Sequence, residues 1–378
     1  MTDTRPGPAS ATPAAAGARE PVSHARLVAS KIAHFAAALF LFVLAIQLMK
    51  KGAQALAPRL ESSGFFDNGV STLGLGWMGA YFVLSGSPIA ATALTFRAAN
   101  GITELQTFTM LSGSRLGASF IVLLVGFLYA VRSPNRRESL GMGVLALSMT
   151  ALVYVPGMVL GYGILRSGLL DGMHWTASAQ LQGAIDAGWG WIVQLTTDHL
   201  PHALLFPIGL GVLLVSFKLL DRVLPSLDGE RHADSRGHWL KKPWPMFFLG
   251  CLAALLTLSV SVALTVLVPL ASKGYVRREE AIPYIAGANI TTLADTLVAA
   301  MLLGSTSGVH VVLAEAIAVA LITIVLLAFA YRHVQRGVMA LDEWVVGTSL
   351  RLWLFVGALF VVPVALMLAG QMIGPIGR

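Results

Sequence analysis

The sequence predicts an all-α, polytopic membrane protein with two inverted-topology repeats, each with a re-entrant helical hairpin and a broken helix. Three observations predict this fold class. Of the 378 residues, 56% are hydrophobic and only 12% are charged, and the apolar runs exceed the length of a soluble core helix. Breaks rich in Ser, Thr and Gly interrupt two of these runs. One sequence offset relates the two breaks.

The N-terminal part combines a polar tail with a first apolar run. Residues 1–30 are rich in Ala, Pro and Ser, a composition that predicts a disordered tail. The run from His34 to Met49 predicts a first transmembrane helix. A secretory signal peptide is the alternative, and the long leader in front of the run disfavours it.

The next apolar run, at about 73–96, is interrupted by Ser85-Gly86-Ser87-Pro88. The arm after this break reaches only about 15 Å at the helical rise per residue, roughly half of the hydrocarbon core. Unpaired backbone groups are costly in lipid, so such a break is expected only where it lines an enclosed or watery site. These lengths favour a re-entrant hairpin over about residues 70–97.

Further runs complete the prediction. The rest of the first half offers spans at 105–131 and 141–165, an external segment at 169–190 and a span at 191–220. After a polar loop at 221–242, the second half offers an interrupted run at 246–269, spans at 281–303 and 309–331, an amphipathic stretch at 339–346 and a last span at 352–372. The predicted domains are thus the tail 1–30, a first repeat 31–166, an external segment 167–187, a second repeat 188–335 with a hairpin at about 246–271, and a C-terminal part 336–378.

One offset of 174 residues relates the two halves. It maps Ser85 onto Ser259, Ser87 onto Ser261 and Gly113 onto Gly287. Interrupted hydrophobic segments in corresponding positions of two halves point to a transporter binding site. The alternative is a helical membrane protein with small residues at its packing interfaces.

The distribution of charge favours hairpins over single crossings. With two hairpins and a cytoplasmic N-terminus, most Lys and Arg residues face the cytoplasm, whereas single crossings export Arg132, Arg136 and Arg137. The formal charge of +7 is therefore explained by basic residues that flank membrane spans, without a nucleic-acid partner. The predicted location is the plasma membrane, which is the inner membrane in a bacterium. The first hairpin then enters from outside and the second from inside.

An inverted pair of hairpins places a site at mid-membrane, where free amides attract an anion and hydroxyl or carbonyl oxygens ligate a hard cation. The candidate substrate-binding residues are Ser85, Ser87, Ser114, Arg115, Ser259, Ser261, Asn289, Thr291 and Thr292. The candidate ion-binding residues are Ser112, Ser259, Asn289, Thr292 and Asp295. Each Ser or Thr, considered alone, could instead form a side-chain hydrogen bond to the backbone of a neighbouring helical turn.

Three charged residues within the predicted spans leave alternatives open. Arg115 could hold an anionic substrate or pair with Asp295. Asp295 and Glu315 could pair with Arg115, carry a proton or help bind a cation. Because Glu315 lies in the middle of neither motif, a structural or interfacial role is favoured for it.

Other site classes find little support. Cys251 is the single cysteine, so neither a disulfide framework nor a Cys-based metal site is available. The segment Asp198-His199-Leu200-Pro201-His202 has metal-like spacing, but Pro201 disrupts a one-face helix, and no metal is predicted. No nucleophile motif or phosphate-binding glycine loop stands out. The chain is therefore not expected to be an enzyme or to hold a cofactor.

The second pair of motifs, Leu258-Ser259-Val260-Ser261 and Gly287-Ala288-Asn289-Ile290-Thr291-Thr292, resembles motifs of the sodium-dependent phosphate cotransporter family. The first pair, at 84–87 and 113–118, resembles a degraded copy. The family motif has glutamine where this chain has Leu84 and Leu258, and serine where it has Gly86 and Val260, which leaves the solute and the sodium stoichiometry open.

The resemblance implies a secondary transporter that moves phosphate or another small anion by alternating access, with sodium as the expected coupling ion. The expected partners are the lipid bilayer and the anion, and a homo-oligomer is left open. The alternative is a non-transporting membrane scaffold or sensor that retains the fold. Transport requires a hydrated polar site between the hairpins, whereas the alternative predicts that Ser259, Ser261 and Asn289 are packed dry.

Overall fold

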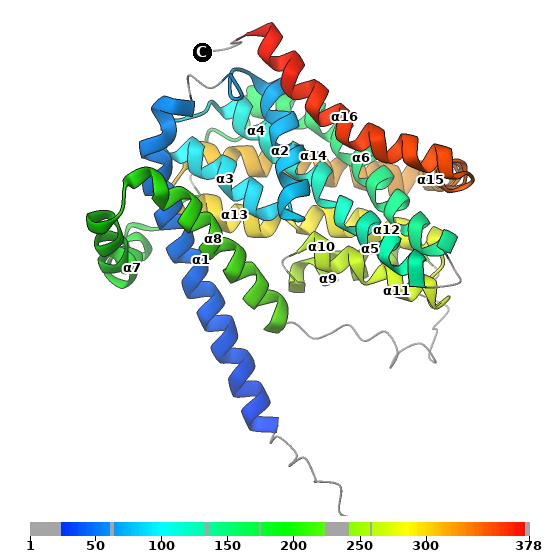
Figure 1. Cartoon of the computed structure of the whole chain (residues 1–378), viewed down its shortest axis with the longest axis horizontal. Helices are drawn as coiled ribbons and strands as arrows, with labels where there is room; N and C mark the ends of the chain where they lie inside the picture. Colours follow the sequence, from blue (N-terminus) through cyan, green and yellow to red (C-terminus); the bar gives the residue numbers. More distant parts are fainter. Residues whose placement is uncertain are drawn as a thin grey trace, which may run out of the picture.

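The computed structural model describes residues 24–60, 64–132, 136–173, 175–223, 242–257 and 259–374, which form helices without any strand among them (Figure 1). The first half contains α1 (His24–Leu60), α2 (Gly69–Val83), α3 (Ser87–Ala98), α4 (Glu104–Ala118), α5 (Phe120–Arg132) and α6 (Arg136–Arg166). Next come α7 (Ala179–His199), α8 (His202–Val223), α9 (Pro243–Thr257), α10 (Val260–Thr265), α11 (Leu267–Ser272) and α12 (Arg278–Thr291). The chain ends with α13 (Leu293–Leu302), α14 (Thr306–Phe329), α15 (Tyr331–Val346) and α16 (Ser349–Ile373).

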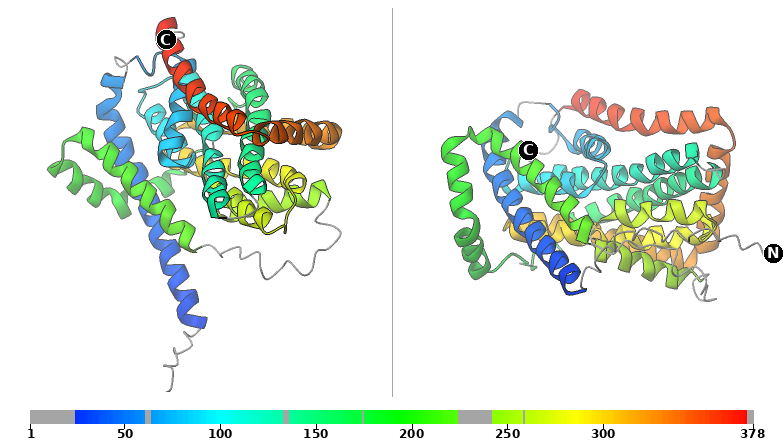
Figure 2. Two further views of the ribbon diagram at one scale, coloured as in Figure 1. Left: turned by 45° about the vertical axis from the view of Figure 1, so that its right-hand side comes forward. Right: turned by 60° about the horizontal axis from the view of Figure 1, so that its bottom comes forward.

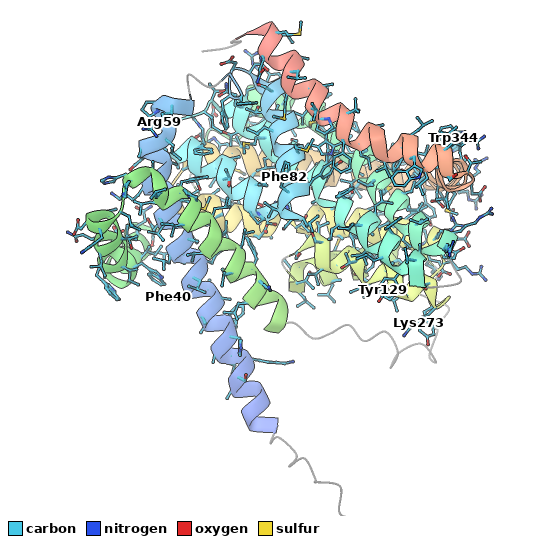
Figure 3. All side chains as sticks on the ribbon, viewed as in Figure 1. Phe40, Arg59, Phe82, Tyr129, Lys273 and Trp344 are labelled. Carbon is cyan, nitrogen blue, oxygen red and sulfur yellow. The ribbon has the colours of Figure 1, made fainter. Side chains whose placement is uncertain are left out.

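Seven helical stretches in the described residues are long and apolar enough to cross a membrane. They are α1, α4 with α5, α6, α8, α12 with α13, α14 and α16. Large apolar side chains cover the outside of the molecule: Phe82 is 83% exposed and projects from α2 (Figure 3), and Phe329 is 84% exposed. Such a surface is suited to lipid rather than water, and the chain is a multi-pass membrane protein.

The first interrupted run forms two helices that double back. Helix α2 ends at Val83, Leu84 adopts a left-handed conformation with φ of 56°, and α3 begins at Ser87 with a proline in its first turn. The rings of Phe66, before α2, and Phe96, near the end of α3, lie 5.7 Å apart. The far ends of the two arms therefore meet.

The second interrupted run is broken in the corresponding place. Helix α9 ends at Thr257, and Ser259 caps α10 by accepting the amide of Val262 at 3.3 Å. Leu258 lies outside the described residues. Helices α10 and α11 then lead the chain back to the start of α12, which runs alongside α9 (Figure 2).

Two helix pairs, α2 with α4 and α9 with α12, pack through the same close approach. A Cβ added to any of four glycines would lie 2.0 to 2.1 Å from a carbonyl oxygen of the neighbouring helix. The four contacts are Gly76 with Met110, Gly250 with Tyr284, Gly113 with Leu73, and Gly287 with Phe247. The first two are related by the offset of 174 residues, and so are the last two. The offset found in the sequence thus relates packing contacts as well as motifs.

Three predicted boundaries differ from the structure. Residues 24–30, expected in the tail, belong to α1, and residues 1–23 lie outside the described part. The predicted span 191–220 is divided at Leu200 and Pro201, because Leu200 is extended and proline cannot continue the helical hydrogen bonding of α7. The amphipathic stretch 339–346 is the end of a longer helix, α15, which begins at Tyr331.

Helices α6, α12 and α15 are joined by an ion-pair cluster. Arg278 at the start of α12 lies 3.1 Å from Glu138 of α6 and also pairs with Asp342 of α15. Asp342 is fully buried, and its desolvation raises its pKa from 3.8 to about 6 even though Arg278 opposes the shift. The cluster fixes the amphipathic helix to both halves of the molecule.

Candidate functional site

The two breaks meet each other. The Ser261 hydroxyl, just after the second break, donates to the carbonyl of Leu84 in the first break at 3.3 Å. Around this contact lies a cavity of about 180 Å³, whose lining includes Ser85, Ser87, Ser259 and Ser261 from the breaks and Phe217 and Lys218 from α8. This volume is several times the roughly 30 Å³ that one water occupies in the liquid. The site is therefore a cavity, lined by serines, a lysine and apolar side chains, between segments far apart in the sequence.

The local sequence explains why the first break holds its shape. Leu84 occupies a left-handed conformation that non-glycine residues rarely adopt, and such strain persists only where surrounding structure imposes it. Gly86 lies so close to α4 that an added Cβ would be 2.7 Å from the carbonyl oxygen of Ser114. Pro88 then sets the backbone for the first turn of α3. The break is thus seated directly on α4.

Arg115 of α4 lies behind the cavity and is 2% exposed. Its Nη1 donates to the hydroxyl of Ser87 at 3.4 Å, and its Nη2 donates to Thr296. The same Nη2 is 3.5 Å from a carboxylate oxygen of Asp295. Of the two alternatives for Arg115, the ion pair with Asp295 is therefore present, and the guanidinium also reaches the cavity wall.

Two buried carboxyl groups accompany Arg115. The Oδ2 atom of Asp295 and both carboxyl oxygens of Glu315 are buried and have no hydrogen-bond partner in the described part of the chain. Glu315 is 0% exposed and lies close enough to Arg115 to interact with it electrostatically. Glu315, which lies in neither motif, is thus part of the same charged region as Arg115 and Asp295. Buried polar oxygens without partners are uncommon and call for a physical explanation.

Asn289 is packed into a hydrogen-bond network rather than open to the cavity. Its Nδ2 donates to Thr150 of α6 at 3.1 Å, and Thr150 is 2.7 Å from the hydroxyl of Ser119. Tyr154 of α6 donates to the carbonyl of Asn289 at 2.8 Å. These bonds tie α12 to the first half of the molecule.

The other predicted residues bond to nearby backbone. Each hydroxyl donates to a carbonyl: Ser112 to Phe108 at 3.0 Å, Ser114 to Leu111 at 2.7 Å, Thr291 to Cys251 at 2.9 Å and Thr292 to Asn289 at 3.2 Å. Such bonds are common for Ser and Thr in membrane helices. The predicted set thus divides into a cavity group, formed by Ser85, Ser87, Ser259 and Ser261, and a packed group.

Several residues at the site were not singled out by the sequence. Thr296 contacts both Arg115 and Asp295, and its position next to a predicted ion ligand is a signal that could have found it. Lys218 lines the cavity from α8, which contains neither motif, so its place depends on how α8 packs. Thr150 and Tyr154 likewise became visible only through the packing of α6 against α12.

Apolar membrane-crossing helices that enclose a buried polar and charged region indicate a membrane transporter. Residues 212–374 match the family model described as Na+/Pi-cotransporter, a range that begins within α8 and ends just after α16. The matched range covers less than half of the chain, and this part is similar to the Na+/Pi-cotransporter family, which is a family of transporters. The chain has no match among curated proteins or among solved structures.

Proposed function

We propose that this protein is a secondary active transporter that moves phosphate or another small anion together with sodium by alternating access. The observation that carries the proposal is the cavity between the two breaks, with four serine side chains in its wall. Hydroxyl groups can donate to an anion and accept from, or ligate, a cation. A small polar solute therefore finds suitable partners here.

The proposed mechanism rests on two inverted repeats with re-entrant hairpins. The shared offset of the glycine contacts and the doubling back of α2 and α3 support this arrangement. The proposed orientation has the N-terminus in the cytoplasm and the protein in the plasma membrane, in agreement with the bias of Lys and Arg. Rocking of one repeat against the other would expose the cavity to each side in turn.

The ion pair between Arg115 and Asp295 suggests how coupling works. While Asp295 neutralises Arg115, an anion in the cavity gains little from the guanidinium. A sodium ion held by Asp295, whose Oδ2 has no hydrogen-bond partner among the described residues, would neutralise that carboxylate. Arg115 would then be available to the anion through the side next to Ser87. Cation and anion would thus bind together rather than separately.

A second candidate function is a non-transporting scaffold or sensor that retains the fold. The observation in its favour is the packed group, because Asn289 and its neighbouring threonines have all their polar contacts within the protein. The cavity group opposes it, since its serines line a cavity that also contains Lys218 rather than packing against apolar side chains alone. The two functions differ in whether solute accumulates across a membrane.

Uptake of labelled phosphate into proteoliposomes, with and without an inward sodium gradient, tests the proposal. We expect gradient-dependent accumulation, and we expect Ser85→Ala and Ser261→Ala to weaken it while Ser167→Ala, on an exposed loop, leaves it unchanged. Absence of phosphate accumulation would argue against phosphate alone. Absence across a panel of small anions would leave the scaffold function.

A further inference from the structure

We propose that Lys218 is the residue that draws the anion into the cavity and sets the apparent affinity for it. This inference rests on the proposed function and deepens it, because it names the cationic group that faces the substrate. Lys218 lies on α8 near its C-terminal end and belongs to the wall of the cavity, together with the serines of both breaks. It is exposed, so the cavity opens at the protein surface beside this side chain, at the end of α8 that the proposed orientation places toward the cytoplasm.

The charges around the cavity single out Lys218. Arg115 approaches the cavity through Ser87, but Asp295 neutralises it at 3.5 Å. Lys218 forms no ion pair and no hydrogen bond with any side chain that the structure describes. None of the described side chains therefore compensates the positive charge of Lys218. Of the cationic side chains at the site, Lys218 thus offers an incoming anion the stronger attraction.

The chemistry of the side chain fits this role. A Lys ammonium is a compact charge with three donors on a flexible stem, so it can follow an anion from the mouth of a cavity toward fixed hydroxyl groups. A single sign of charge at the mouth of a low-dielectric cavity raises the local concentration of the opposite ion. The effect depends on the charge of the solute, which favours a multiply charged anion such as hydrogen phosphate over a monovalent one.

The test compares Lys218→Gln with Lys218→Arg and with Lys51→Gln, which removes an exposed lysine of α1 that does not line this cavity. In proteoliposomes at low ionic strength we expect Lys218→Gln to raise KM by about 3- to 10-fold, with Vmax little changed, for phosphate supplied on the side of the membrane that Lys218 faces. Lys218→Arg should retain most of the affinity. Because the Debye length shortens as salt is added, the difference should shrink at high salt.

A binding measurement separates this inference from the proposed function. Inorganic phosphate should stabilise the purified wild-type protein against heat, and less so the Lys218→Gln protein. If phosphate stabilises the wild type more than it stabilises Lys218→Gln, but neither phosphate nor any other small anion is transported, the proposed function fails while the role of Lys218 stands. If Lys218→Gln and Lys51→Gln show the same KM and the same stabilisation, or if no small anion stabilises the wild type, the role of Lys218 is overturned.

Discussion

The guanidinium of Arg115 and the carboxylate of Asp295 lie 3.5 Å apart with side chains that are 2% and 4% exposed. Arg115 comes from α4 and Asp295 from α13, so this pair joins the two halves of the molecule within its interior. Removing one member of a buried pair leaves an uncompensated charge, whereas removing both is far less costly. This asymmetry leads to the first prediction.

Arg115→Gln and Asp295→Asn should each lower thermal stability strongly, on the order of 3–5 kcal/mol. The double variant should recover most of that loss, because neither charge remains. Thermal unfolding of the four proteins in detergent gives the coupling energy through a double-mutant cycle. Equal and additive losses in the two single variants would mean that the two groups do not interact.

Cysteine labelling should reveal the hydrated cavity. Since Cys251 is the single cysteine, Cys251→Ala provides a background without thiols. In it, Ser85→Cys and Ser261→Cys should react with a small, charged thiol reagent, because both positions line the cavity. Ser114→Cys should not react, as Ser114 is fully buried. Equal protection of all three would indicate a dry, packed junction.

The close glycine contacts should be intolerant of a methyl group at both corresponding positions. Gly113→Ala and Gly287→Ala each place a Cβ 2.1 Å from a carbonyl oxygen, and overpacking of this kind costs about 1–3 kcal/mol or more. Gly357→Ala on α16, with nothing within 4 Å, should be neutral or stabilising by about 0.5–1 kcal/mol. Thermal unfolding measures all three. Tolerance at one of the two corresponding positions alone would argue against equivalent packing.

The cluster at Arg278 should make stability depend on pH through Asp342. Burial raises the pKa of Asp342 from 3.8 to about 6, so the folded state binds this proton more tightly than the unfolded state. The resulting stability is fully present below about pH 4 and is lost as the pH rises through about 6. Relative to Asp342→Asn, the wild type should lose on the order of 2–3 kcal/mol between pH 4 and pH 7.5. Parallel pH profiles of the two proteins would contradict this assignment.

Much of the architecture was predictable because membrane burial leaves strong marks in a sequence. The helix breaks at Ser85 and Ser259 were predictable since clustered hydroxyl residues interrupt otherwise apolar runs there, and the shared offset linked Gly113 to Gly287 before any packing was known. The division of α7 from α8 was not predicted, because the hydropathy of the run outweighed a single proline at position 201.

The candidate site was predictable only in part. The serines of the cavity lie next to the breaks that produce it, so local sequence was sufficient to find them. Asn289 is likewise a polar residue within an apolar run, yet its side chain bonds to Thr150 of a distant helix. Local sequence cannot distinguish an amide that is packed in this way from one that faces a cavity. Lys218 lies on a helix without either motif, and its place follows from tertiary packing alone.

The contacts at Gly76, Gly113, Gly250 and Gly287 also limit how the molecule can change shape. Helices held at such short range cannot slide past each other without backbone collisions, so each helix pair is expected to move as one rigid body. In the proposed alternating access, displacement would then concentrate at the junction between Ser261 and Leu84, where a hydrogen bond of 3.3 Å joins the two breaks. A compound that bridges this junction would therefore stop the relative movement of both helix pairs, although it would contact only the two breaks.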